Sequence, residues 1–93
     1  MVDFTAFWAG PYATAYFAAL GADVVKIESM QRPDGMRFAN AFEPVDGITW
    51  EWASVFHGAN PGKRDLTLDL GSKEGLALAH RLIENCDVVI ENF

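Results

Sequence analysis

The sequence is poor in the residues that support several common classes of protein. It has one cysteine, Cys86, among 93 residues, so we expect no internal disulfide and a cytoplasmic protein. Seven basic residues stand against 13 acidic ones, and the net charge of −6 argues against nucleic-acid binding. No apolar run approaches the ~20 residues of a membrane span, and no signal-peptide pattern opens the chain. We therefore expect no membrane attachment.

Patterns for metal binding and dinucleotide binding are also missing. His57 and His80 are far apart, and neither stands at a metal-ligand or nucleophile spacing from Cys86. We therefore expect no metal, an exposed His80 on a helix, and a buried, unreactive thiol at Cys86. The glycine fingerprint G-x-G-x-x-G of dinucleotide-binding folds is absent as well.

What the sequence does have is an alternation of strands and helices. Apolar residues make up 51% of the chain, which is enough for a core in one small domain or in part of a larger one. Apolar, β-branched stretches predict four strands, and apolar residues at helical spacing predict two main helices. We expect strands near 2–5, 23–28, 66–70 and 86–91, and helices near 11–20 and 73–85. This order predicts an α/β fold with a parallel sheet.

Individual residues mark the ends of these elements. Pro11 suits the first position of a helix, Gly21 suits a left-handed C-cap, and Ser72 suits an N-cap. Both helices carry apolar residues at helical spacing. In the first helix these are Tyr12, Ala15, Tyr16, Ala19 and Leu20, and in the second they are Leu76, Ala79, Leu82 and Ile83.

The middle of the chain is less regular. Residues 29–47 contain two prolines and two glycines, so we expect a long loop. Residues 48–56 predict a short helix, which Gly58 ends. We interpret Trp8, Trp50 and Trp52 as packing residues, except that Trp50 and Trp52 cannot both be core in one element, so one of them is expected to face a partner.

Two short stretches are candidates for ligand binding. The turn at Ala9-Gly10-Pro11 opens a helix, whose unpaired N–H groups could meet an anion or a thioester oxygen; alternatively it is an ordinary helix start. The basic pair Lys63-Arg64 could meet phosphates, or it could be a solvated turn. Neither stretch identifies a reaction.

Several blocks, in the expected order, resemble family III CoA-transferases, the group that includes formyl-CoA transferase and the acyl-CoA racemases. The first is Asp3-Phe4-Thr5 with Ala9-Gly10-Pro11, which is similar to the family's D-x-T-x-x-x-A-G-P signature. The others are "LGADVVKIE" at 20–28, the D-x-x-R at 34–37, "NPGKR" at 60–64 with the "LDL" that follows it, and "CDVVIENF" at 86–93. The resemblance covers the whole chain.

The resemblance implies a Rossmann-like parallel sheet that binds coenzyme A. Trp8 and Ala9, with Gly10, would flank the CoA thioester, and Ser29 would lie near the adenine. The residues expected to contact CoA are Trp8, Ala9, Gly10, Ser29, Leu68, Asn92 and Phe93. This chain departs from the family's usual residues at Ala6, Ser29 and Asp65, which affects individual site residues more than family membership.

The resemblance also implies what the intact protein does. Family members move CoA between an acyl-CoA and a carboxylic acid acceptor through an aspartyl intermediate, or racemise acyl-CoA. Their catalytic aspartate lies beyond position 93, and none of this chain's aspartates matches it. We therefore expect no catalytic residue here: residues 1–93 would be the N-terminal part of a larger domain, in a homo-oligomer. Two alternatives are a standalone, non-catalytic CoA- or nucleotide-binding module and a structural remnant that self-associates.

Overall fold

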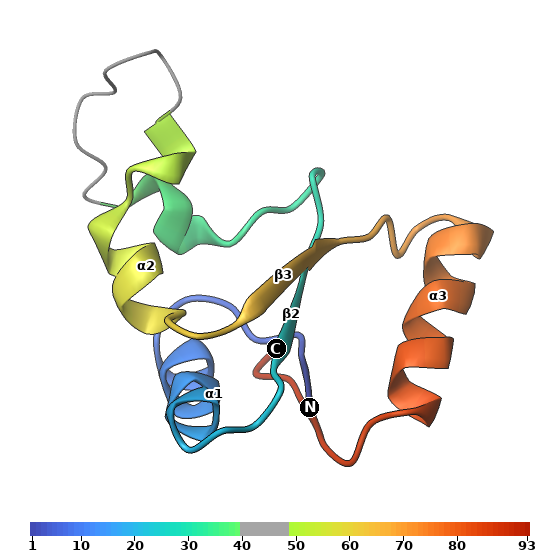
Figure 1. The fold of residues 1–93 in the computed structure, drawn as a ribbon. Helices are drawn as coiled ribbons and strands as arrows, with labels where there is room; N and C mark the ends of the chain where they lie inside the picture. The colour runs from blue at the N-terminus through green and yellow to red at the C-terminus, as the bar shows by residue number, and fades with distance from the viewer. Residues whose placement is uncertain (40–48) are drawn as a thin grey trace.

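A four-stranded parallel sheet forms the centre of the protein. The computed structural model describes residues 1–39 and 49–93 (Figure 1). The strand order is β3-β2-β1-β4, and every neighbouring pair is parallel. The strands are β1 (Val2–Asp3), β2 (Val25–Glu28), β3 (Arg64–Thr67) and β4 (Val89–Ile90). The helices are α1 (Ala9–Ala19), α2 (Ser54–Ala59) and α3 (Lys73–Glu84), with 3₁₀ turns η1 (Gly35–Phe38) and η2 (Thr49–Glu51).

The helices cover the sheet from both sides. Figure 1 shows α1 and α2 beside one face of the sheet and α3 beside the other. This confirms the predicted α/β fold with a parallel sheet and flanking helices. In the two described ranges, all helices are shorter than a bilayer crossing requires.

The strands put different chemistry on the two faces of the sheet. Val2 pairs with Val25 and Val89, whereas Asp3 pairs with Lys26 and Ile90. Because alternate residues of a strand point to opposite faces, β1 and β2 each send apolar side chains to one face and polar ones to the other. The face towards α3 holds the apolar core, which consists of Val2, Ile27, Leu68 and Ala79 with Phe4, Val25, Leu82 and Cys86 beside them.

The caps at Gly21 and Ser72 were predicted correctly, but Pro11 is the third residue of α1 rather than the first, and several other boundaries differ as well. Gly21 has φ 97°, and the Ser72 side chain accepts a hydrogen bond from the Gly75 N–H, as expected of these caps. The third strand is Arg64–Thr67 rather than 66–70, and all four residues are exposed because β3 is at the edge of the sheet. The short helix does not end at Gly58, which lies inside α2. Residues 40–48, part of the predicted loop and the start of the predicted short helix, lie outside the described residues.

The aromatic and apolar side chains of α1 face outward. Tyr12, Tyr16 and Leu20 are 55%, 65% and 81% exposed. The buried side of this helix consists instead of small or polar residues, namely Gly10, Pro11, Thr14 and Ala15. The helical spacing therefore predicted the helix but not which side of it is buried. Small residues on the buried side let α1 lie close to a polar face of the sheet, so this side lacks the large apolar residues that the spacing rule looks for.

Other predictions about burial have mixed outcomes. His80 is exposed, as expected. Cys86 is partly exposed rather than buried. Trp8, Trp50 and Trp52 are each about half exposed, at 56%, 45% and 45%, so none of the three is a core residue, and Trp50 and Trp52 both face partly outward where only one was expected to.

Candidate functional site

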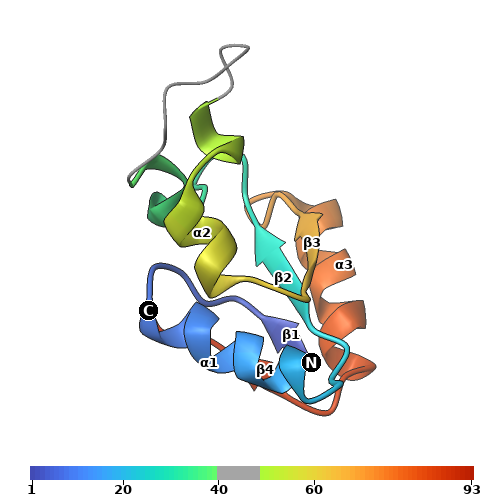
Figure 2. The ribbon, with the colours of Figure 1, turned by 60° about the vertical axis from the view of Figure 1, so that its left-hand side comes forward.

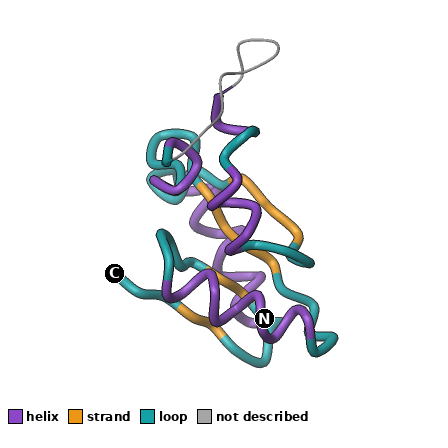
Figure 3. The backbone as a smooth tube through the Cα atoms, turned by 90° about the vertical axis from the view of Figure 1, so that its left-hand side faces the viewer, coloured by secondary structure: helices purple, strands orange, loops and turns teal. Residues whose placement is uncertain are grey.

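The candidate site lies at the carboxyl edge of the sheet. The chain adds β2 and then β3 on one side of β1, and afterwards places β4 on the other side. Such a reversal of strand order opens a crevice between the carboxyl ends of the two strands where ligands bind in open α/β sheets. Here those strands are β1 and β4. The C-terminal residues accordingly lie beside the loop that joins β1 to α1 (Figures 2 and 3).

Beneath this edge, Asp3 and Lys63 form a buried ion pair. Lys63 Nζ lies 3.0 Å from Asp3 Oδ2, and the two side chains are 2% and 0% exposed. Burial alone would raise the pKa of Asp3, but hydrogen bonds from Thr14, Thr5 and Lys63 outweigh it and lower this pKa. Lys63 Nζ also donates to Asn60 Oδ1 and to the Pro11 carbonyl. Lys63 is thus a structural residue with no free donor for a phosphate, and that alternative is wrong for it.

A second buried pair joins β2 to the segment before η1. Lys26 Nζ lies 3.1 Å from Asp34 Oδ2, off the direction of a hydrogen bond, and both side chains are 2% exposed. Lys26 Nζ also donates to the carbonyl of Thr5 at 2.7 Å. Lys26 thus joins β2 both to the end of β1, through Thr5, and to the segment before η1, through Asp34. Losing Asp34 would leave Lys26 as a buried, unpaired charge, which is strongly unfavourable.

Arg37 of η1 holds a third set of charges at the end of β2. Its guanidinium contacts the carboxylates of Glu28, Glu51 and Asp65, and its Cζ lies 3.7 Å from the centre of the Phe56 ring. Burial would raise the pKa of Glu28, but the hydrogen bonds from Arg37 lower it. Burial and the neighbouring Glu28 raise the pKa of Asp65 to about 6. This carboxyl group therefore titrates closer to neutral pH than an ordinary aspartate does.

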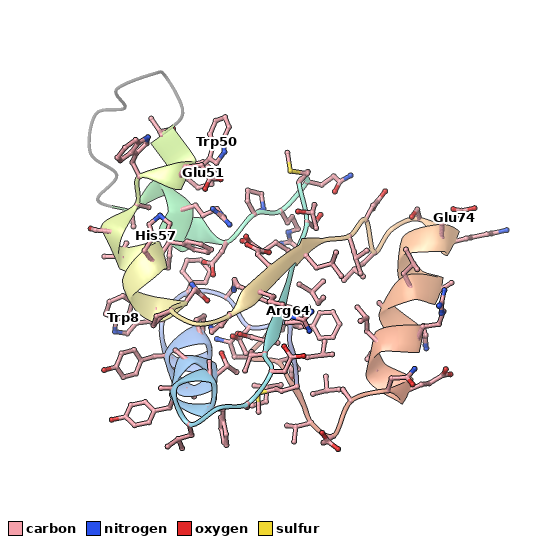
Figure 4. The ribbon with its side chains drawn as sticks, viewed as in Figure 1. Trp8, Trp50, Glu51, His57, Arg64 and Glu74 are labelled. Atoms are coloured by element: carbon pink, nitrogen blue, oxygen red, sulfur yellow. The ribbon has the colours of Figure 1, made fainter. Side chains whose placement is uncertain are left out.

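A hollow opens over the carboxyl ends of β2 and β3. Its volume is about 320 Å³, and Ser29 and Arg37 are among the residues that line it. The other lining residues are Glu28, Met30, Pro33, Phe38, Trp50, Glu51 and Thr67. Its walls combine apolar side chains with polar and charged ones, among them Glu28, Arg37 and Glu51. Figure 4 shows Trp50 and Glu51 together at this end of the molecule.

The loop between β1 and α1 faces the crevice. Trp8 is exposed, and Figure 4 shows its side chain pointing outward on the side of α1 and α2. Within residues 1–39 and 49–93, the backbone N–H groups of Trp8 and Ala9 donate no hydrogen bond. At the start of a helix such groups carry partial positive charge and can bind an anion or a polarised carbonyl.

Other predicted site residues lie differently from what the sequence indicates. Leu68 follows β3, but its side chain is in the apolar core, so only its backbone faces the edge. Gly10 is buried, and a Cβ added there would lie 2.4 Å from Cβ of Thr5 rather than in the crevice. The side chain of Asn92 is hydrogen-bonded to the backbone of Ala6, and the side chain of the next residue, Phe93, is exposed.

Sequence reasoning did not single out two cations near this edge. Arg32 lies in a turn in which its N–H donates to the Ser29 carbonyl, and Lys73 is the first residue of α3, the next element after β3. Among the described residues neither has a carboxylate partner. Their position after neighbouring strands could have indicated them, since the carboxyl ends of parallel strands share one edge.

The fold defines this chain as an α/β protein with a parallel sheet and a hollow at the carboxyl edge of that sheet. The family model described as CoA-transferase family III matches residues 1–93. The chain belongs to CoA-transferase family III and corresponds to the N-terminal region of that family.

Similar proteins agree with this membership. Succinate–glutarate CoA-transferase of Agrobacterium fabrum is 44% identical over 87 residues, which are 91% of this chain and 22% of that protein. Succinyl-CoA:mesaconate CoA-transferase of Haloarcula hispanica is 43% identical over 94 residues, covering 100% of this chain and 23% of that protein. The crystal structure of a CAIB/BAIF family protein from Brucella suis superposes with a TM-score of 0.83 at 40% identity, over 99% of this chain and 24% of that one. The chain thus spans less than a quarter of the length of these proteins.

Proposed function

We propose that this chain binds the CoA thioester at the carboxyl edge of its sheet, as the CoA-binding part of an enzyme that moves CoA between carboxylic acids. The observation that carries the proposal is the shared location of the predicted residues. Trp8 and Ala9 follow β1, Ser29 follows β2, and Asn92 and Phe93 follow β4, all at one edge. CoA is long and has a nucleotide end and a thioester end, so it suits a site with a hollow at one strand pair and free N–H groups at another.

Charge indicates which end of CoA binds where. The nucleotide end carries the phosphates, and the cations Arg32 and Lys73, which have no carboxylate partner within residues 1–39 and 49–93, lie after β2 and β3. The thioester is neutral, and the N–H groups of Trp8 and Ala9 would polarise its carbonyl oxygen. CoA would therefore run along the edge, with its nucleotide near β2 and β3 and its thioester in the crevice between β1 and β4.

The chain would bind and orient the thioester without supplying the nucleophile. Covalent transfer requires a carboxylate held against the thioester carbon. Asp3 and Asp34 are buried in ion pairs below the crevice and are not free to attack. The aspartate that would form the acyl intermediate is thus expected outside residues 1–93. The intact protein would be a cytoplasmic homo-oligomer that uses an acyl-CoA and a carboxylic acid as substrates. The exposed aromatic face of α1 supports self-association.

Calorimetric titration of the chain with CoA tests the binding proposal. Trp8→Ala is expected to weaken binding about tenfold, in line with the energy of a buried aromatic contact. Trp52→Ala is the matched control, because Trp52 is a tryptophan of similar exposure that follows η2 and lies outside the loop between β1 and α1. The same loss from both variants, or no binding by the unchanged chain, would refute the proposal.

Charge variants test the orientation of CoA. Lys73→Gln and Arg32→Gln should weaken binding of CoA but not of pantetheine, which lacks the nucleotide. Arg81→Gln is the control, since Arg81 lies at the other end of α3 from Lys73. If pantetheine binding falls as much as CoA binding, the orientation is wrong.

An acyl-exchange assay separates the proposal from its alternatives. We expect the chain alone to bind CoA but to show no turnover with an added carboxylate. Intact-mass measurement after incubation with acyl-CoA should show no adduct. An acyl or CoA adduct on an aspartate or glutamate would mean that the nucleophile lies within this chain. A chain that self-associates without binding CoA would favour the structural remnant instead.

A further inference from the structure

Side chains from three other parts of the chain hold the backbone of the loop that follows β1. The N–H of Ala6 donates to Asn92 Oδ1, and its carbonyl accepts from Asn92 Nδ2, both at 2.9 Å. The N–H of Phe7 donates to Asp34 Oδ1 at 3.0 Å. The carbonyl of Thr5 accepts from Lys26 Nζ at 2.7 Å.

The conformation that these bonds hold is an unfavourable one. Phe7 has φ 65°, which is the left-handed region that residues with a Cβ rarely adopt. A non-glycine residue keeps such a conformation only where its surroundings over-determine it. Gly35 contributes by leaving room: a Cβ there would lie 2.8 Å from Cε1 of the Phe7 ring. The turn at Phe7 is thus fixed by side-chain hydrogen bonds on its backbone, since the Phe7 ring approaches Gly35 but is itself 62% exposed.

The sources of these bonds suggest more than a role in stability. Asn92 follows β4 and Ala6 follows β1, so their paired bonds cross the crevice at which the strand order reverses. Asn92 is exposed and adds nothing to the core. The residues directly after the fixed turn are Trp8 and Ala9, whose N–H groups are the proposed thioester contacts.

We propose that Asn92 and Asp34 are positioning residues, which lock the Ala6–Phe7 turn and thereby aim the N–H groups of Trp8 and Ala9 into the crevice. They act through the backbone of the turn rather than on the reacting atoms. Lys26 supports Asp34 from below through their ion pair. The role in aiming the N–H groups rests on the proposed function, but the hydrogen bonds that lock the Ala6–Phe7 turn can be measured without any ligand.

Amide hydrogen exchange, followed by NMR on the whole chain, tests the lock. Asn92→Asp removes the donor to the Ala6 carbonyl and puts a carboxylate oxygen in its place. Exchange at Ala6 and Phe7 should become about tenfold faster, because their hydrogen-bonded turn opens more often. Exchange at Ile27 in β2 should not change. Asn85→Asp is the matched control, since Asn85 Nδ2 likewise donates to a backbone carbonyl, that of Arg81 at 2.7 Å, but at the end of α3.

A CoA titration of the same variants tests the purpose of the lock. Asn92→Asp should weaken CoA binding about tenfold, and Asn85→Asp should leave it unchanged. Asp34→Asn, which keeps an oxygen acceptor for the Phe7 N–H, should retain more of the binding than Asp34→Ala. Unchanged exchange at Ala6 and Phe7, or equal acceleration at Ile27, would overturn the lock. Faster exchange with full CoA affinity would overturn the positioning role. If the unchanged chain does not bind CoA, the proposed function fails, while the exchange result still decides the lock.

Discussion

The two faces of the sheet are built by opposite means. The face towards α3 is apolar and is packed from Val2, Ile27, Leu68 and Ala79. The face towards α1 and α2 is polar: it buries the pairs Asp3–Lys63 and Lys26–Asp34. The hydroxyls of Thr5 and Thr14 both donate to Asp3. Hydrophobic contacts are tolerant of direction, whereas buried ion pairs require exact partners. The polar face therefore sets the geometry of the carboxyl-edge loops, and removing one partner of its ion pairs is expected to be costly, whereas the apolar face tolerates small changes in its side chains.

The largest expected effect on stability comes from removing one partner of the Asp3–Lys63 ion pair on the polar face. Asp3→Asn keeps the shape of the side chain but leaves Lys63 as a buried, unpaired cation, so it should lower the free energy of unfolding by about 3–5 kcal/mol. Ile27→Val on the apolar face should lower it by only about 1 kcal/mol. Urea denaturation measures both.

Two further variants check the physical reason for that loss. Asp87→Asn, at an exposed position, should change the free energy of unfolding by less than about 0.5 kcal/mol. Adding Lys63→Met to Asp3→Asn removes the unpaired cation, so the double variant should be more stable than Asp3→Asn alone. A double variant whose loss equals the sum of two independent losses would show that the pair is not coupled.

The next effect concerns how closely α1 approaches the polar face. Gly10→Ala would bring a Cβ to 2.4 Å from Cβ of Thr5 and should destabilise the protein by about 1–3 kcal/mol. Gly58→Ala is the matched control: apart from its chain neighbours and the backbone of its own helix, no atom of the described residues lies within 4 Å of its added Cβ, and it is inside α2. It should stabilise by about 0.5–1 kcal/mol.

Thermal or urea unfolding of the two glycine variants gives the comparison directly. Equal and small effects at both positions would mean that α1 can shift away from Thr5 at little cost. In that case the small residues of α1 would not be what brings this helix to the sheet.

The dependence of stability on pH sharpens the comparison further. The pKa of Asp65 is raised from 3.8 to about 6, so the folded state binds this proton more tightly than the unfolded state does. The contribution of Asp65 to the free energy of unfolding therefore increases as the pH falls from about 6 to about 4. The lowered pKa values of Asp3 and Glu28 act in the opposite direction: their contribution is present above the unfolded values of 3.8 and 4.5 and is lost below them.

We accordingly expect stability to be greatest at a mildly acidic pH. Asp65→Asn should flatten the decline in stability between about pH 4 and pH 6 and leave the loss below pH 4 in place. Urea denaturation at a series of pH values measures this. A variant with the same decline as the unchanged chain would show that Asp65 is not the group responsible.

The apolar face and the polar face differ in how far the sequence predicts them. Periodicity and capping predicted the strands, the helices and the caps at Gly21 and Ser72. Periodicity did not predict that α1 turns Tyr12 and Tyr16 outward, because the buried partners of Thr14 are polar and contribute no apolar signal. The family resemblance marked Asp3 and Lys63 as motif residues. Their pairing joins positions 60 residues apart, which only the fold brings together.

The smallest effect separates two neighbouring basic residues. Arg64 pairs with Asp23, but these side chains are 67% and 72% exposed, so Arg64→Gln should change stability by less than about 0.5 kcal/mol. Lys63→Gln, one position earlier, leaves Asp3 buried without its cation and should cost several times more. The pair Lys63-Arg64 would then consist of one buried structural residue and one solvated residue. If the two variants lose the same stability, burial of the charge is not what makes the polar face different.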